Sequence, residues 1–133
     1  MKTILISLCV LAGLVSSSLG DVLPIGAKKA VVTLGKDPKV VVVDLRTPKE
    51  FAKGHIKGAI NLDMRDKDFS EKLGKFDRKK TYLMHCRSGG RSSASIPVWD
   101  SLGFENVLHL TTGTLGWVKA GQKLFVPAEK AAK

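Results

Sequence analysis

Residues 85–92 bring a cysteine together with residue types that can hold an anion. The segment is His85, Cys86, Arg87, Ser88, Gly89, Gly90, Arg91 and Ser92. Two glycines allow a tight turn in which successive amide N–H groups point toward one centre and form an anion nest. A helix that starts here would add its positive N-terminal end. Because such surroundings lower the pKa of a thiol, the segment predicts that Cys86 is a thiolate nucleophile.

Arg87 and Arg91 bracket this segment at the expected start of the helix. A cation at that end of a helix costs about 0.3–1 kcal/mol, because it opposes the macrodipole. This cost in stability is explained if an anion binds between the two arginines. The alternative is that both side chains extend into solvent. His85 is an unsuitable base for Cys86, because adjacent strand residues point to opposite faces. We therefore interpret His85 as a packing or supporting residue.

Residues 1–20 have the pattern of a cleaved secretory signal. Lys2 precedes an apolar stretch at residues 4–15, and Ser18 and Gly20 fit the minus-three and minus-one positions of a cleavage site. A membrane anchor is the alternative, but a span needs about 20 apolar residues. We therefore expect an exported protein, periplasmic or extracellular, without a stable membrane anchor. Cys9 would leave with the signal, so Cys86 would be the remaining thiol.

Composition limits the class of protein. The 133 residues include 44% hydrophobic and 26% charged residues, which excludes a disordered chain and a polytopic membrane protein. We expect one domain over residues 21–133. The cysteines and histidines have no zinc-site spacing, so we expect no metal and no cofactor. The formal net charge of +10 favours anionic partners, but the lysines are scattered and few aromatic residues lie among them. We therefore expect no nucleic acid to bind, and interpret the charge as steering anionic donors.

Helical and strand patterns alternate along the chain and would position Cys86. Alternation of this kind predicts an α/β fold, a mostly parallel sheet with helices on both faces, whose site lies at the carboxyl ends of the strands. Asp44 with Arg46, Cys86 with Arg87, and Thr111 with Thr112 occupy such ends. The predicted helices are 27–34, 48–53, 69–73, 91–102 and 115–120, and the predicted strands are 40–43, 59–62, 81–86 and 106–110.

Three motifs in order resemble those of the rhodanese family. Residues 44–51 (Asp-Leu-Arg-Thr-Pro-Lys-Glu-Phe) and 54–61 (Gly-His-Ile-Lys-Gly-Ala-Ile-Asn) are similar to its first signature. Residues 86–92 are similar to its active-site loop, and residues 102–107, Gly113 and residues 117–121 to its closing segment. The resemblance covers about residues 25–127. It implies a rhodanese-like α/β fold with a central five-stranded, mostly parallel sheet.

The resemblance also implies a sulfurtransferase that works through a persulfide on Cys86. The donor would be thiosulfate, a polysulfide or a persulfide, and the acceptor cyanide or a thiol. The amides of residues 87–91 would hold the persulfide, and Arg87 and Arg91 would orient the anionic donor. Asp44 and Arg46 would support the loop as an ion pair, and His55 would lock a turn through a hydrogen bond. Thr112 and Pro97 depart from the family pattern.

Two alternatives to this enzyme remain open. A cysteine phosphatase or arsenate reductase has a similar signature, but with five residues between cysteine and arginine, whereas four separate Cys86 from Arg91. The shorter loop suits a single sulfur better than a tetrahedral oxyanion. A periplasmic persulfide carrier without fast turnover would need the same Cys86. The sequence does not indicate whether the protein is a monomer or an oligomer.

Overall fold

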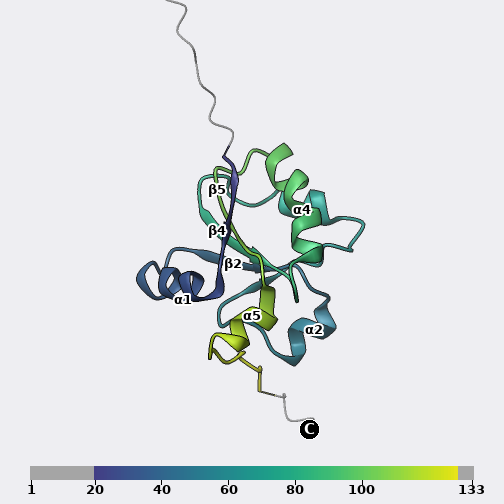
Figure 1. Ribbon diagram of the computed structural model, residues 1–133. Helices are drawn as coiled ribbons and strands as arrows, with labels where there is room; N and C mark the ends of the chain where they lie inside the picture. Colours follow the sequence, from purple (N-terminus) through teal and green to yellow (C-terminus); the bar gives the residue numbers. More distant parts are fainter. Residues whose placement is uncertain (1–19, 129–133) are drawn as a thin grey trace, which may run out of the picture.

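All five strands of the sheet run parallel, in the order β1-β5-β4-β2-β3. The computed structural model describes residues 20–128, and helices lie on both faces of the sheet (Figure 1). In chain order the elements are β1 (Val22–Ile25), α1 (Ala27–Lys36), β2 (Val41–Asp44), α2 (Pro48–Lys53), β3 (Ile60–Asn61), α3 (Phe69–Leu73), β4 (Thr81–His85), α4 (Gly90–Ser101), β5 (Asn106–Leu110) and α5 (Gly113–Lys119).

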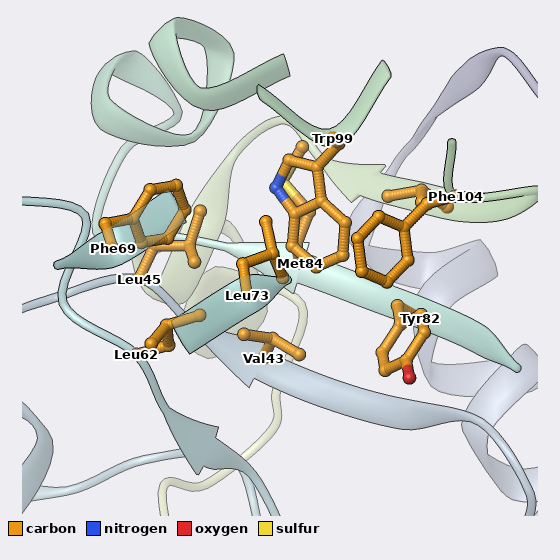
Figure 2. Close-up of a cluster of buried hydrophobic side chains, with 10 residues drawn as sticks. Val43, Leu45, Leu62, Phe69, Leu73, Tyr82, Met84, Trp99 and Phe104 are labelled. Atoms are coloured by element: carbon orange, nitrogen blue, oxygen red, sulfur yellow. The ribbon is translucent and has the colours of Figure 1, made fainter. Parts of the chain in front are cut away.

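Two apolar cores hold the helices against the sheet, because successive strand residues face opposite sides. On one face Val43 and Met84 pack with residues of α3 and α4, among which Trp99 is fully buried (Figure 2). On the other face Val42 and Leu83 pack with residues of α1 and α5. Both faces of β4, which directly precedes Cys86, are therefore packed against helices.

The predicted alternation of helices and strands is confirmed, with one strand added. The sequence patterns gave four strands, whereas the resemblance implied the five that are present. The missed strand, β1, has only four residues and contains Pro24. It lies at the edge of the sheet, where a proline removes no ladder hydrogen bond on the open side. Pro97 does not interrupt α4, which continues to Ser101.

The predicted signal lies outside the described residues, apart from Gly20. Among residues 20–128, no helix is both long enough and apolar enough to cross a bilayer.

Candidate active site

Cys86 lies directly after β4, and its side chain points into the turn that leads to α4. The residue is 1% exposed. The Gly89 amide donates a hydrogen bond to Sγ at 3.1 Å, and the Ser92 Oγ lies 3.3 Å from Sγ. Burial by itself raises the pKa of the Cys86 thiol, but hydrogen bonds from the Ser92 hydroxyl and from the amides of Ser92, Gly89 and Ser88 outweigh it. The net result is a lowered pKa, which favours the thiolate.

Gly89 is the glycine that gives this turn its shape. Its φ of 102° lies in the left-handed region, and a Cβ built there would lie 2.1 Å from the carbonyl oxygen of Thr111. Gly90 has no such constraint, because a Cβ at its position would meet no atom within 4 Å and it is already the first residue of α4. The nest therefore depends on one of the two glycines that the sequence offered.

The start of α5 holds the other side of the turn. The Thr114 amide donates to the Cys86 carbonyl oxygen at 3.0 Å, and the Leu115 amide donates to that of Arg87 at 3.1 Å. Gly113 makes this approach possible, because its φ is 59° and a Cβ would lie 2.4 Å from the Arg87 oxygen. Thr112 is exposed and lines a groove of about 310 Å³ between α1 and α5. Its hydroxyl is not among the groups that hydrogen-bond with Cys86 Sγ in the described residues.

The two arginines of the segment have different surroundings. Arg91 makes two hydrogen bonds of 2.8 Å with the Glu50 carboxylate, and this pairing keeps the pKa of Glu50 well below its usual range. Glu50 also accepts a hydrogen bond from the amide of Thr47 and completes a capping box at the start of α2. Arg87 is exposed and has no ion-pair partner among residues 20–128. Arg87 is thus the arginine of this segment whose guanidinium is not engaged by a carboxylate of the described residues.

Asp44 and Arg46 form a buried ion pair at the carboxyl end of β2. The Arg46 Nη2 lies 2.7 Å from Asp44 Oδ2, and it also donates to the Gly54 carbonyl oxygen at 2.7 Å. The pair therefore fixes the end of α2 to the end of β2. Asp44 lies opposite His85 in the sheet, and His85 directly precedes the loop. The ion pair therefore supports the loop through His85 and not through a contact with Sγ.

His55 lies at the turn after α2, away from the thiol. Its Nδ1 hydrogen-bonds with the Phe51 carbonyl oxygen at 2.9 Å, and its ring stacks on that of Phe51 with centroids 3.7 Å apart. Its backbone pairs with Phe125. These contacts join α2 to the segment after α5.

His85 is fully buried next to Cys86, but its ring nitrogens face other groups. Nδ1 lies 2.9 Å from the Cys86 carbonyl oxygen, and Nε2 lies 4.0 Å from Asp44 Oδ2. Burial lowers the pKa of His85, so the ring is neutral near neutral pH. The ring therefore supports the turn and does not take part in the chemistry of Sγ.

Ser92 ends the segment that the sequence singled out but had no predicted role, and His109 was not singled out at all. The Ser92 Oγ touches the thiol and lies 2.7 Å from Nε2 of His109, on β5. Both side chains are buried. The sequence signal for His109 was its place next to Leu110, at the end of a buried strand, where a polar residue is unusual. Its partner is 17 residues away in the chain, so local patterns could not connect the two.

Other features of the described residues lie apart from Cys86. A cavity of about 450 Å³ lined by Lys39 and Lys79 lies at the amino ends of β2 and β4, the opposite end of the sheet. Residues 20–128 contain no group of three His, Cys, Asp or Glu side chains placed to hold a metal ion.

Comparison with known proteins agrees with this geometry. The rhodanese-like domain family matches residues 28–120. A sulfurtransferase of Allochromatium vinosum is 31% identical over 88 residues, which are 66% of this chain and 80% of that protein. An uncharacterized protein of Synechocystis is 35% identical over 95 residues, 71% of this chain, and the chain spans about half (52%) of its length. The crystal structure of a rhodanese-related protein from Thermoplasma volcanium, 26% identical, aligns with a TM-score of 0.69 over 79% of this chain and 99% of that one. The chain therefore belongs to the family of rhodanese-like domains.

Proposed function

We propose that the protein is a sulfurtransferase that carries a sulfane sulfur as a persulfide on Cys86. The observation that carries this proposal is the buried Sγ within hydrogen-bond distance of the Gly89 amide and the Ser92 hydroxyl. These donors stabilise a thiolate and would stabilise a persulfide anion in the same place. Membership of the rhodanese-like family and the likeness to the Allochromatium vinosum sulfurtransferase support it.

The reaction has two steps. The Cys86 thiolate attacks the outer sulfur of thiosulfate, so that a new S–S bond forms while the old one breaks and sulfite leaves with the electron pair. Cyanide or a thiolate then attacks the terminal sulfur of the persulfide and leaves with it, which regenerates the Cys86 thiolate. Neither step needs a partner base, because the nucleophile is already deprotonated. The exposed Arg87 attracts and orients the anionic donor.

The surroundings of Arg91 argue against a phosphatase or arsenate reductase. Such enzymes need the guanidinium of the loop arginine to hold a tetrahedral oxyanion. Here both Arg91 bonds go to Glu50. The loop is also one residue shorter than a phosphatase loop. Sulfur transfer is therefore the function that this geometry supports best.

The test is to load the protein and then unload it. Residues 21–133 are incubated with thiosulfate, and the intact mass is expected to rise by one sulfur atom. Cyanide should then restore the mass and release thiocyanate. The variant Cys86→Ser should show neither change, because it lacks the nucleophile. If no sulfur adds while a phosphate ester is hydrolysed, the proposal is wrong.

Turnover distinguishes an enzyme from a persulfide carrier. An enzyme releases many equivalents of thiocyanate per Cys86 in excess thiosulfate and cyanide. A carrier loads and unloads once, and turns over only when a partner protein is supplied. We propose the enzyme, so turnover of about one per second or faster is expected, in the usual range of enzymes.

We also propose that the protein is exported and that residues 1–20 are removed. The support is the basic residue, the apolar stretch and the small residues before Asp21. Expression of the full chain with a C-terminal tag should give an exported product whose N-terminal residue is Asp21. A product that stays inside the cell and begins at Met1 would contradict this proposal.

A further inference from the structure

The Ser92 hydroxyl lies among three possible partners but has only one proton. Its Oγ is 3.3 Å from Cys86 Sγ, 3.2 Å from the Gly89 carbonyl oxygen and 2.7 Å from His109 Nε2. Side chains of Cys86, Ser92 and His109 are all buried. A carbonyl oxygen and a thiolate can only accept a hydrogen bond, whereas an imidazole nitrogen donates or accepts according to its tautomer. The proton on the histidine ring therefore decides where the hydroxyl proton goes.

One tautomer directs the hydroxyl proton toward the thiol. With a proton on Nε2, His109 donates to the Ser92 Oγ, which keeps its own proton for an acceptor. The Cys86 thiolate and the Gly89 carbonyl oxygen then compete for it at similar distances. The thiolate is favoured, because a hydrogen bond to a charged acceptor is about twice as strong as one between neutral groups.

The other tautomer directs the hydroxyl proton away from the thiol. With the ring proton on Nδ1, Nε2 is an acceptor, and the Ser92 hydroxyl donates its hydrogen bond to Nε2 at 2.7 Å. The lone pairs of Oγ then face Sγ, which suits a protonated thiol. A thiolate would lose its side-chain donor in this arrangement, and with it the hydrogen bond that most lowers the pKa of Cys86 against the effect of burial.

We propose that His109 is a positioning residue that acts through the Ser92 hydroxyl to favour the thiolate form of Cys86. The inference deepens the proposed function and rests on it only in taking Cys86 as the nucleophile. Its role is to orient a donor, so the ring itself exchanges no atom with the sulfur. The donation from Nε2 to Oγ is the contact that carries the effect.

Charged and titratable neighbours leave His109 neutral, so its tautomer is what matters. Burial, and in addition His85 on β4, lower the pKa of His109. The groups that face His85 or Cys86 are Asp44, Arg46 and Arg91, the last paired with Glu50. None of these groups replaces the Ser92 hydroxyl as a hydrogen-bond donor to Sγ. The His109 tautomer therefore still determines whether that hydroxyl donates to Sγ.

Alkylation of Cys86 by iodoacetamide across a pH series tests the inference without sulfur transfer, since the rate follows the thiolate fraction. His109→Leu should raise the pH midpoint of alkylation and lower the rate about tenfold at a pH below that midpoint. Ser92→Ala should have a similar effect. His109→Gln, whose side-chain amide can donate to Oγ, should recover most of the rate. A structural role alone would not produce this rescue.

The double variant tests whether His109 acts through Ser92. In a Ser92→Ala background, His109→Gln or His109→Leu should shift the midpoint no further, because the path to Sγ is already cut. An additive shift would overturn the inference, and so would an unchanged midpoint in folded His109→Leu. If His109→Leu does not fold, His109→Met, whose side chain also lacks a hydrogen-bond donor, takes its place in both backgrounds.

Ser95→Ala is the matched control. Ser95 is a buried serine three residues further along α4, and its Oγ donates to the Ser92 carbonyl oxygen at 2.7 Å rather than to Sγ. Its alkylation midpoint should equal that of the wild type. A shift as large as that of Ser92→Ala would overturn the inference, because packing of α4 would then explain both. A wild-type protein with a lowered midpoint that takes no sulfur from thiosulfate would refute the proposed function and leave this inference standing.

Discussion

The carboxylate of Glu50 pairs with one of the two arginines in the loop that follows Cys86. It neutralises Arg91 through two hydrogen bonds of 2.8 Å, and the ion pair is only partly exposed. Of the two arginines that the sequence predicts to bind an anion, Arg91 is therefore paired with Glu50, whereas Arg87 has no carboxylate partner among residues 20–128. Thr47 and Glu50 form a capping box within four residues, whereas the second partner of Glu50, Arg91, lies 41 residues further along and local patterns do not connect the two.

Replacing Glu50 with glutamine should strengthen thiosulfate binding. Glutamine can still complete the capping box, but without its charge it releases the Arg91 guanidinium for the donor. The expected result is a thiosulfate KM about two- to fivefold lower, with little change in kcat, from the energy typical of a partly exposed ion pair. Steady-state kinetics at low salt measure this.

Glu71→Gln is the control for net charge, since Glu71 is an exposed acid on α3 outside the loop. Its KM should stay at the wild-type value. An unchanged or higher KM in Glu50→Gln would mean that Arg91 does not meet the donor at all.

Among the elements, the connection from β4 to α4 depends most on backbone geometry. Gly89 adopts a left-handed conformation against Thr111, whereas Gly90 begins the helix in open space. The motif containing both was recognisable in the sequence, and so were the strand before it and the helix after it. Gly89 is the constrained glycine because it approaches Thr111, the residue after β5. The place where β5 ends is set by the packed sheet and not by the sequence near the glycines.

Alanine at the two positions should separate them. Gly89→Ala combines a disfavoured backbone conformation with a Cβ 2.1 Å from a carbonyl oxygen, so it should cost about 1–3 kcal/mol of stability and slow alkylation of Cys86. Gly90→Ala should be close to neutral on both counts. Urea unfolding and iodoacetamide kinetics measure the two effects. Equal losses in the two variants would show that the left-handed turn is not the cause.

Element prediction succeeded where a local pattern decides the structure. The predicted helix 48–53, strand 40–43 and helix 115–120 correspond to α2, β2 and α5, and each depends on residues close together in the chain. It failed for β1, because that short strand with Pro24 is stabilised by pairing with β5, more than 80 residues later. The contact between Ser92 and His109 was missed for the same reason, since it exists only once β4 and β5 are adjacent.

The whole molecule should lose stability in mild acid. His85 and His109 are both buried, and burial lowers the pKa of each from 6.5. Below that pH the unfolded chain binds protons that the folded chain resists, so their contribution is fully present above about pH 6.5 and is lost as pH falls toward the folded pKa values. A second loss should begin below about pH 4.5, where the unfolded chain protonates Glu50 and the folded ion pair opposes it.

Urea unfolding at about pH 7 and about pH 5 measures the first loss, in the range where histidine titrates. The free energy of unfolding should be lower at the more acidic pH, and the difference should shrink in His109→Gln, which removes one of the two groups. Equal stability of the wild type at both values would show that the buried histidines do not govern acid sensitivity.

Because Glu50 accepts hydrogen bonds both from the cap of α2 and from Arg91, the helix and the loop form one cooperative unit. An anion that draws Arg91 toward the thiol would remove one of the contacts that hold the Glu50 carboxylate against the cap of α2, and by thermodynamic reciprocity a more mobile Glu50 would make anion binding easier. Binding of sulfite in the loop should therefore speed up hydrogen exchange at the backbone amides of the first turn of α2, although these amides lie away from the sulfur.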